Sequence, residues 1–260
     1  MSFQSGTRAG TSLPRAVSDF LLYPGEGRVG FSGSTLKILA CGSMLIDHTG
    51  AAVVRTLLRS PAVSDPALRS ELGQLYTWMR AVGRLAFPIF CFLLVEGFMH
   101  TRNVEKYARR LLLFALLSEF PFDFALKSSW FYPAKQNVYF TLLIGLLVMW
   151  GQQIFRDCTV LQALVFMAGL MAGQLLRTDY GYKGVFLIEV LCLLRYYRTA
   201  QCICGGIAFS YEKWAPLSMI FCWLYNGKRG IRLKYIFYFF YPAHLLVLGA
   251  IRHFVIPALG

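Results

Sequence analysis

Long apolar runs recur along this sequence of 260 residues, and short polar stretches separate them. A helix needs about 20 apolar residues to cross a bilayer, and most of these runs approach that length. Their length favours helices over the short, alternating strands of a membrane barrel. The pattern predicts an all-α, polytopic transmembrane bundle of about eight spans. The predicted spans cover residues 36–54, 82–100, 108–126, 138–155, 160–176, 183–197, 201–224 and 235–256.

Two of the predicted spans are weaker than the others. The span at 183–197 is short, and Glu212 and Lys213 interrupt the span at 201–224. Lys and Arg residues divide almost evenly between the two sets of alternate loops, so their pattern does not fix the orientation in the membrane. We therefore expect that the fifth, sixth or seventh segment does not span simply.

The first 35 residues differ from the rest of the chain. They are rich in Gly and Ser, carry scattered Arg residues, and lack the apolar core of a signal peptide. We predict a flexible or interfacial tail over 1–35, in which 20–22 could form a short surface helix. A membrane domain over 36–260 follows it.

The composition agrees with a membrane protein, because 57% of the residues are hydrophobic and only 15% are charged. The net charge is +13. It reflects either loops at the membrane surface or an anionic ligand that carries phosphates. The basic residues are spread over loops without a nucleic-acid-binding motif, which argues against a nucleic-acid partner. The seven cysteines lie mostly in apolar runs without a C-x-x-C pair, so they resemble small buried hydrophobes.

An Asp-His pair, Asp47 and His48, lies within the apolar stretch 36–50. Ionisable groups in such a setting are costly and usually functional. Imidazole exchanges protons near neutral pH, so His48 could act as a general base. Adjacent helical residues point to different faces, so we expect the partner of His48 on another helix rather than at Asp47. Later polar points are His244 in the last span and the loop at 179–182.

Basic residues near the ends of two spans suit an anionic ligand. Lys37 precedes His48 by 11 residues, which returns it to nearly the same helix face about 16 Å away along the axis. Asn226, Lys228 and Arg229 form a tight basic turn. Its backbone N–H groups and charges could hold phosphate, although such a turn is more often a solvated loop.

The second and third spans carry further polar side chains. Arg84 and Glu96 lie in the second span, and Pro88 between them should kink the helix and free a carbonyl. Glu96 could orient His48 or pair with Arg84. Glu119 and Asp123 lie four residues apart at the end of the third span, so either one of them holds its proton or both face an arginine. No set of these residues has the ligand spacing of a metal site.

Seven stretches taken together resemble the TraX family, which is named for the conjugative-plasmid protein that N-acetylates F-type pilin. They are LKILACGSMLIDHTG, GRLAFPIFCFLLVEGFMHTRN, ARRLLLFALLSEFPFD, QNVYFTLLIGLL, DYGYKGV, LYNGKRG and KYIFYFFYPAHLLVL. The resemblance covers roughly residues 36–253. TraX proteins in turn look related to membrane acyltransferases, which take an acyl group from cytoplasmic coenzyme A with an essential histidine on an early helix.

The resemblance implies an acyltransferase of the inner (plasma) membrane that uses acetyl-CoA. It makes His48 the catalytic histidine, with Arg84, Glu96 and Asp123 as supporting residues. His48 would act as general base, Arg84 would stabilise the oxyanion, and Glu96 or Asp123 would hold the imidazole tautomer. A covalent acetyl-histidine intermediate is an open alternative.

The resemblance leaves the ligands less defined than the chemistry. The basic residues Lys37, Lys228 and Arg229, with Asn226, would hold the phosphates of acetyl-CoA. The acceptor is an amine or hydroxyl of a pilin, a peptide terminus, a sugar or a cell-envelope glycan. A proton-coupled transporter also places Asp, Glu and His inside the membrane, although no internal repeat is visible here. A non-catalytic assembly factor for surface pili is the third alternative, and it would tolerate loss of His48.

Overall fold

The computed structural model describes residues 30–127, 129–231 and 234–259. Within these ranges every regular element is a helix, and the extended contacts are two isolated bridges. The prediction of an all-α fold is confirmed. The predicted tail up to residue 29, with the surface helix at 20–22, lies outside the described residues. Residues 33–35, which we assigned to the tail, form the first turn of α2.

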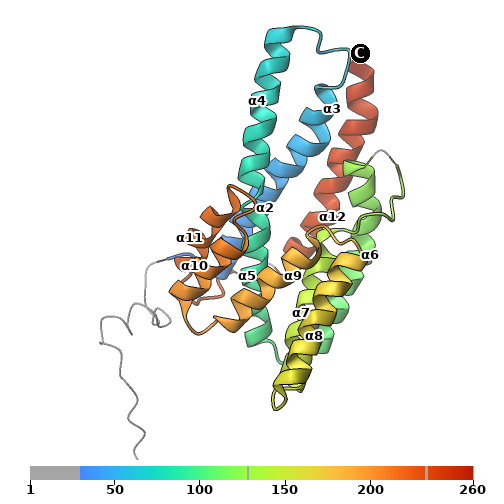
Figure 1. Cartoon of the computed structure of the whole chain (residues 1–260). Helices are drawn as coiled ribbons and strands as arrows, with labels where there is room; N and C mark the ends of the chain where they lie inside the picture. Colours follow the sequence, from blue (N-terminus) through green and yellow to red (C-terminus); the bar gives the residue numbers. More distant parts are fainter. Residues whose placement is uncertain (1–29, 128, 232–233, 260) are drawn as a thin grey trace, which may run out of the picture.

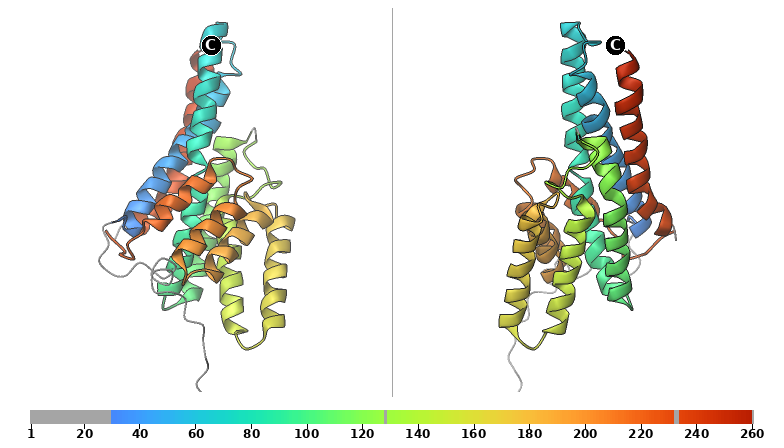
Figure 2. Two further views of the ribbon diagram at one scale, coloured as in Figure 1. Left: turned by 60° about the vertical axis from the view of Figure 1, so that its left-hand side comes forward. Right: turned by 90° about the vertical axis from the view of Figure 1, so that its right-hand side faces the viewer.

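Three long helices project together beyond the rest of the bundle (Figures 1 and 2). They cover Gly33–Leu57, Pro66–His100 and Ile236–Ala258, and each is long and apolar enough to cross a membrane. The first consists of α2 (Gly33–Thr49), the π-helical turn η1 (Gly50–Val54) and α3 (Arg55–Leu57). The second consists of α4 (Pro66–Gly83) and α5 (Ala86–His100). The third lies within α12 (Lys234–Ala250), the π-helical turn η3 (Ile251–Val255) and the 3-10 turn η4 (Ile256–Leu259).

The remaining helices pack against the lower part of these three (Figure 1). They are α6 (Val104–Leu126), α7 (Val138–Ile154), α8 (Thr159–Leu175), α9 (Gly181–Leu193), α10 (Arg198–Ala208), the 3-10 turn η2 (Ala215–Leu217) and α11 (Ser218–Trp223). Among them α7 and α8 are shorter apolar helices. Consecutive helices from α6 to α9 are neighbours in space, as their short connections require.

The prediction of about eight spans is wrong in its later part. The stretch 201–224 is not one span, because it divides into α10, η2 and α11. Glu212 and Lys213 interrupt its apolar run, and Pro216 lacks the N–H that a continuous helix needs. Helix α9 has 13 residues, fewer than the roughly 20 that cross a bilayer. The expectation that a segment in this region does not span simply is therefore confirmed.

Helix α4 has no counterpart among the predicted spans. Arg69, Glu71 and Arg80 break the apolar run over this stretch. The helix forms nonetheless, because the Asp65 side chain accepts hydrogen bonds from the first free backbone N–H groups and Pro66 suits the first helical position. It packs along α2 and η1. The first two long helices thus run side by side.

A break between α4 and α5 lies at Arg84 and Leu85. Pro88 has no backbone N–H, so the carbonyl of Arg84, four residues earlier, loses its helical partner. The interruption predicted from Pro88 is confirmed. It leaves Arg84 at the junction of the two helices, where its side chain faces the cavity described below.

A buried ion pair joins α5 to α10 in the core. Glu96 Oε1 lies 3.1 Å from Arg198 Nη2, and both side chains are almost fully buried. The guanidinium of Arg198 also lies 4.5 Å above the Phe92 ring and donates to Gln201. Glu96 is therefore a structural group, and the expectation that it orients His48 or pairs with Arg84 is wrong.

We expect Arg198→Met to destabilise the protein strongly, because it removes the buried cation that lies 3.1 Å from the Glu96 carboxylate. The free energy of unfolding should fall by about 3–5 kcal/mol, and adding Glu96→Gln should restore part of it. Unfolding in detergent micelles measures both effects. Arg109→Ala removes an exposed ion pair with Glu105 and should change stability by less than about 0.5 kcal/mol. An equal effect of Arg198→Met and Arg109→Ala would contradict this account.

Candidate functional site

A cavity of about 490 Å³ lies where the ends of α6, α7 and α9 meet the long helices. Helix α6 ends beside it at Leu126, α7 begins there at Val138, and α9 begins there after Tyr180. His48 of α2 and Tyr241 of α12 line the opposite wall. Helices from the beginning, the middle and the end of the sequence thus meet at one site.

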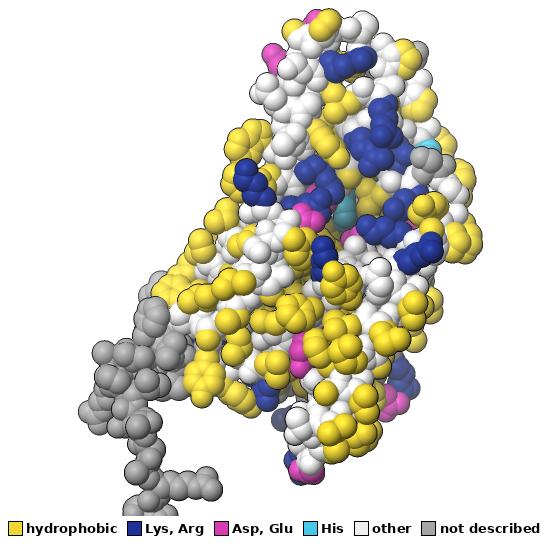
Figure 3. Space-filling model, in the orientation of Figure 1, with side chains coloured by type: hydrophobic (Ala, Val, Ile, Leu, Met, Phe, Trp, Pro, Cys, Tyr) yellow, Lys and Arg dark blue, Asp and Glu magenta, His cyan; other side chains and the backbone are white. Residues whose placement is uncertain are grey.

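The cavity lining is strongly cationic. Six basic side chains line it, Arg55, Arg80, Arg84, Lys127, Lys135 and Lys183, against three carboxylates, Asp47, Asp179 and Glu212. Figure 3 shows Lys and Arg side chains gathered around a hollow on this face, with a histidine visible inside it. The N-termini of α7 and α9 also point at the cavity and add positive dipole ends. The site therefore favours an anionic ligand.

Asp47 faces the cavity from α2 and is held by α4. Arg80 Nη1 donates to Asp47 Oδ2 at 2.6 Å. The other oxygen, Oδ1, is buried without a hydrogen-bond partner among the described residues. Gly83 allows this close approach, because a Cβ at that position would overlap the Asp47 side chain.

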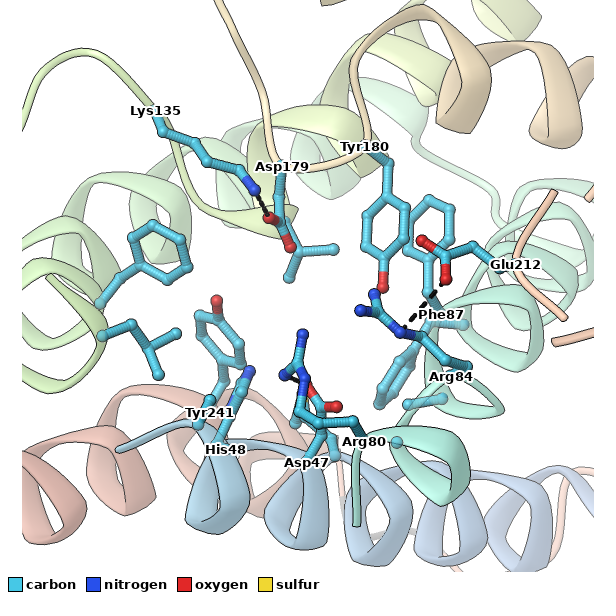
Figure 4. A pocket seen from close by; sticks show the side chains of 18 of the residues that line it. Asp47, His48, Arg80, Arg84, Phe87, Lys135, Asp179, Tyr180, Glu212 and Tyr241 are labelled. Carbon is cyan, nitrogen blue, oxygen red and sulfur yellow. Dashed lines mark hydrogen bonds and ion pairs between the residues drawn. The ribbon is translucent and has the colours of Figure 1, made fainter. Parts of the chain in front are cut away.

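Arg84 is fixed at the edge of the cavity. Its Nε lies 3.2 Å from Glu212 Oε2, so the residue that interrupts a predicted span belongs to the site. Tyr180 stacks on Phe87, with ring centroids 3.5 Å apart and planes 6° apart. In Figure 4 the Tyr180 hydroxyl points toward the Arg84 guanidinium, which faces the cavity. Arg84 is thus held in place while its outer nitrogens face the cavity.

Two loops close the cavity opposite His48. Lys135 Nζ lies 2.7 Å from Asp179 Oδ1, and the dashed line in Figure 4 marks this pair. The backbone N–H of Gln136 donates to the Arg177 carbonyl at 3.1 Å, and Gln136 forms an isolated bridge with Thr178. These contacts therefore join the loop before α7 to the loop before α9.

Three cavity cations have no carboxylate within ion-pair distance among the described residues, namely Arg55, Lys127 and Lys183. Lys183 Nζ lies 4.0 Å above the Tyr211 ring instead. Lys127 follows the last turn of α6, where burial lowers the pKa of its ammonium and the charge of Lys135 lowers it further. A bound anion would relieve this repulsion.

His48 reaches the cavity from the last turn of α2. Its ring points into the cavity in Figure 4, between Tyr241 and Arg80. Nδ1 of His48 lies 2.7 Å from Nε2 of His244 on α12. This contact agrees with the expectation that the partner of His48 lies on another helix, but the partner is a histidine rather than a carboxylate.

The structure brings together some of the predicted catalytic residues and separates others. Asp47, His48 and Arg84 line the cavity. Glu96 and Asp123 do not line it. The sequence places these two carboxylates within predicted helices, but helical periodicity does not indicate toward which neighbouring helix each one points.

Asp123 is buried at the end of α6 and anchors the loop that follows. Its Oδ2 accepts a hydrogen bond of 2.6 Å from the backbone N–H of Tyr132. Its neighbours Phe122 and Lys127 line the cavity. Asp123 therefore positions the segment that carries cavity residues and does not contact His48.

None of the four predicted ligand-binding residues lines the cavity. Lys37 lies in the first half of α2, and Asn226, Lys228 and Arg229 form a turn that contacts the start of that helix. The carbonyl of Lys228 accepts a hydrogen bond of 2.8 Å from the backbone N–H of Gly33. The basic turn thus caps the first turn of α2, about 22 Å along the axis from His48. The helix-face argument for Lys37 is sound, but that face meets the cavity only at its far end.

The residues around the cavity differ in how visible they are in the sequence. Asp179 and Tyr180 belong to a polar loop, and His244, which contacts His48, is polar within an apolar run. Arg80 and Lys183 lie at or beyond the limits of predicted spans, where basic residues are common. Within the described ranges, no group of three or more His, Cys, Asp or Glu side chains is arranged to hold a metal ion.

The fold and the cavity define a helical membrane protein with a charged site around a histidine. The chain matches the family described as "TraX protein" over residues 32–252, and it therefore belongs to the TraX family. A "Probable fimbrial assembly protein FimC, serogroup H1" of Dichelobacter nodosus is 30% identical over 265 residues, which cover 87% of this chain and 98% of that protein. No solved structure matches the chain. The predicted family resemblance is confirmed.

We expect Gly83→Ala to disrupt the site, because its methyl group would displace the Asp47 side chain and break the pair with Arg80. Overpacking of this kind costs about 1–3 kcal/mol. Thermal unfolding in detergent micelles measures the loss. The matched control is Gly42→Ala on α2, where an added Cβ meets no atom within 4 Å. Equal melting temperatures for the two variants would contradict the close approach of Gly83 and Asp47.

Proposed function

We propose that this TraX protein is an acyltransferase of the inner membrane. It transfers an acetyl group from acetyl-CoA to an amine or hydroxyl acceptor. The observation that carries the proposal is His48, which lies in a cationic cavity with Arg84 and Arg80 around it. Such a cavity offers a general base and donors for a developing negative charge in one place.

The charge distribution supports a donor that carries phosphates. Arg55, Lys127 and Lys183 are cavity cations whose charge no described carboxylate neutralises within ion-pair distance. The diphosphate and the 3′-phosphate of coenzyme A carry the matching negative charge. We assign the phosphate contacts to these residues in place of Lys37 and Lys228, because the latter lie at the far end of α2.

The residues then divide the chemistry between them. The bound donor supplies a thioester carbonyl to the cavity. His48 Nε2 takes the proton from the attacking amine or hydroxyl as the new bond to that carbonyl forms. Arg84 stabilises the negative charge on the carbonyl oxygen. Arg80 holds the Asp47 carboxylate in place in the cavity wall. His48 returns the proton to the sulfur of the leaving thiolate, which leaves the histidine neutral.

The acceptor is supported only through the family. The relative from Dichelobacter nodosus carries the name of a fimbrial assembly protein, so a pilin-like peptide is the first acceptor to test. An envelope glycan with a free hydroxyl is the alternative. The cationic cavity disfavours an ammonium group and favours a neutral amine or hydroxyl, which is the nucleophilic form.

That relative's name also favours a second candidate, a non-catalytic assembly factor. Such a factor needs no general base, so it would keep its effect on surface structures when His48 is replaced. A proton-coupled transporter, the third candidate, would move solute into proteoliposomes without acetyl-CoA.

We expect His48→Gln to lower acetyl transfer by about 10²–10⁴-fold, because it removes the base and keeps a polar side chain of similar size. Radiolabelled acetyl-CoA, purified protein and a membrane extract measure the transfer. His253→Gln is the matched control, since His253 contacts the Phe124 carbonyl and does not line the cavity. Transfer that is absent in the wild type, or equal in His48→Gln, would refute the acyltransferase.

We expect Lys127→Ala and Arg55→Ala to raise KM for acetyl-CoA by about tenfold each, which corresponds to about 1.4 kcal/mol of lost phosphate binding. The KM for acetyl-pantetheine, which lacks the phosphates, should not change. Lys228→Ala tests the other end of α2. A rise in KM for acetyl-CoA with Lys228→Ala alone would place the phosphates at the start of α2 and overturn our assignment.

A further inference from the structure

His48 and His244 form a direct imidazole–imidazole contact between α2 and α12. Nδ1 of His48 lies 2.7 Å from Nε2 of His244, and the two ring planes differ by only 5°. The ring centroids are 5.0 Å apart, as expected when one short hydrogen bond joins two rings edge to edge. The rings therefore lie almost in one plane, and the bond runs along the lone pair of the accepting nitrogen.

The protonation of this pair follows from its far end. Nδ1 of His244 lies 2.6 Å from the backbone carbonyl of Phe240. A carbonyl oxygen only accepts, so His244 Nδ1 must carry the hydrogen. In the neutral ring Nε2 is then an acceptor, and the hydrogen between the rings belongs to His48 Nδ1. His48 is left with an unprotonated Nε2, the nitrogen that is available to the cavity.

We propose that His244 is the positioning residue that holds His48 in the Nδ1–H tautomer, so that the Nε2 of His48 faces the substrate as a base. This inference rests on the proposed acyl transfer. It assigns to a neutral histidine the role that a carboxylate has in a catalytic triad. Neither Glu96, Asp123 nor Asp47 fills that role, because each is engaged elsewhere.

The surroundings of His244 suit this role. Its side chain is buried, and its ring stacks on Phe240 and meets Tyr241 edge-on. These contacts and the carbonyl bond fix the ring orientation. When the proton of the acceptor reaches His48 Nε2, the cation can share its Nδ1 hydrogen with His244 Nε2, which spreads the charge over two rings. The proton at Nε2 is the one that leaves with the thiolate.

The test combines a tautomer measurement with kinetics on the full-length protein in micelles. The chain has four histidines, so ¹⁵N labelling of histidine gives few ring signals, and single replacements assign them. We expect wild-type His48 to be protonated at Nδ1 and not at Nε2. His244→Leu should shift His48 toward the Nε2–H form and lower kcat by about 100-fold, with KM for acetyl-CoA within about twofold.

A conservative variant and a matched control separate positioning from structure. His244→Gln offers an oxygen that can accept from His48 Nδ1, so it should regain at least about tenfold of the lost kcat. His100→Leu removes a histidine with the same contact to the carbonyl four residues earlier, outside the cavity, and should leave kcat and the His48 signals unchanged.

Two results would overturn the inference. One is a wild-type His48 that is protonated at Nε2, and the other is a kcat of His244→Leu within about twofold of wild type. If the wild type transfers no acetyl group, the proposed function fails. The ¹⁵N signals of His48 in wild type and His244→Leu still decide the pairing in that case, because they do not depend on turnover.

Discussion

The packing of α2 between α4 and α12 is the constraint on which the site depends. Asp47 and His48 are adjacent in the sequence and point to different neighbours, so each needs a polar partner from a separate helix. Arg80 supplies one from α4 and His244 the other from α12. Gly83 is required because a side chain there would occupy the space of the Asp47 carboxylate.

The second physical feature is an excess of positive charge around this pair. Three cavity cations have carboxylate partners, and three have none within ion-pair distance in the described part of the chain. The N-termini of α7 and α9 add to the positive potential. Unneutralised charge near a membrane adds little to the stability of a protein. This excess of positive charge therefore favours a functional role in anion binding.

Part of the site follows from the sequence. The apolar run around Asp47 and His48 makes them candidates, since unpaired ionisable groups in such a run are costly. The break at Arg84 follows from Pro88, whose missing N–H frees a carbonyl. Glu96 and Asp123 meet the same criterion of burial, yet Glu96 pairs with Arg198 and Asp123 binds the backbone of Tyr132. Burial marks a carboxylate as satisfied by some partner but does not identify the partner.

The sequence by itself determined that the chain is helical and membrane-embedded, that it belongs with TraX proteins, and that His48 lies among apolar residues. These properties depend on local hydrophobicity and on motifs that are continuous in the chain. Only the tertiary structure decided that His244 contacts His48, that Glu212 reaches Arg84, and that Lys37 and Lys228 lie outside the cavity. Such contacts depend on how each helix is rotated and offset against its neighbours, and helical periodicity within one segment does not fix either quantity.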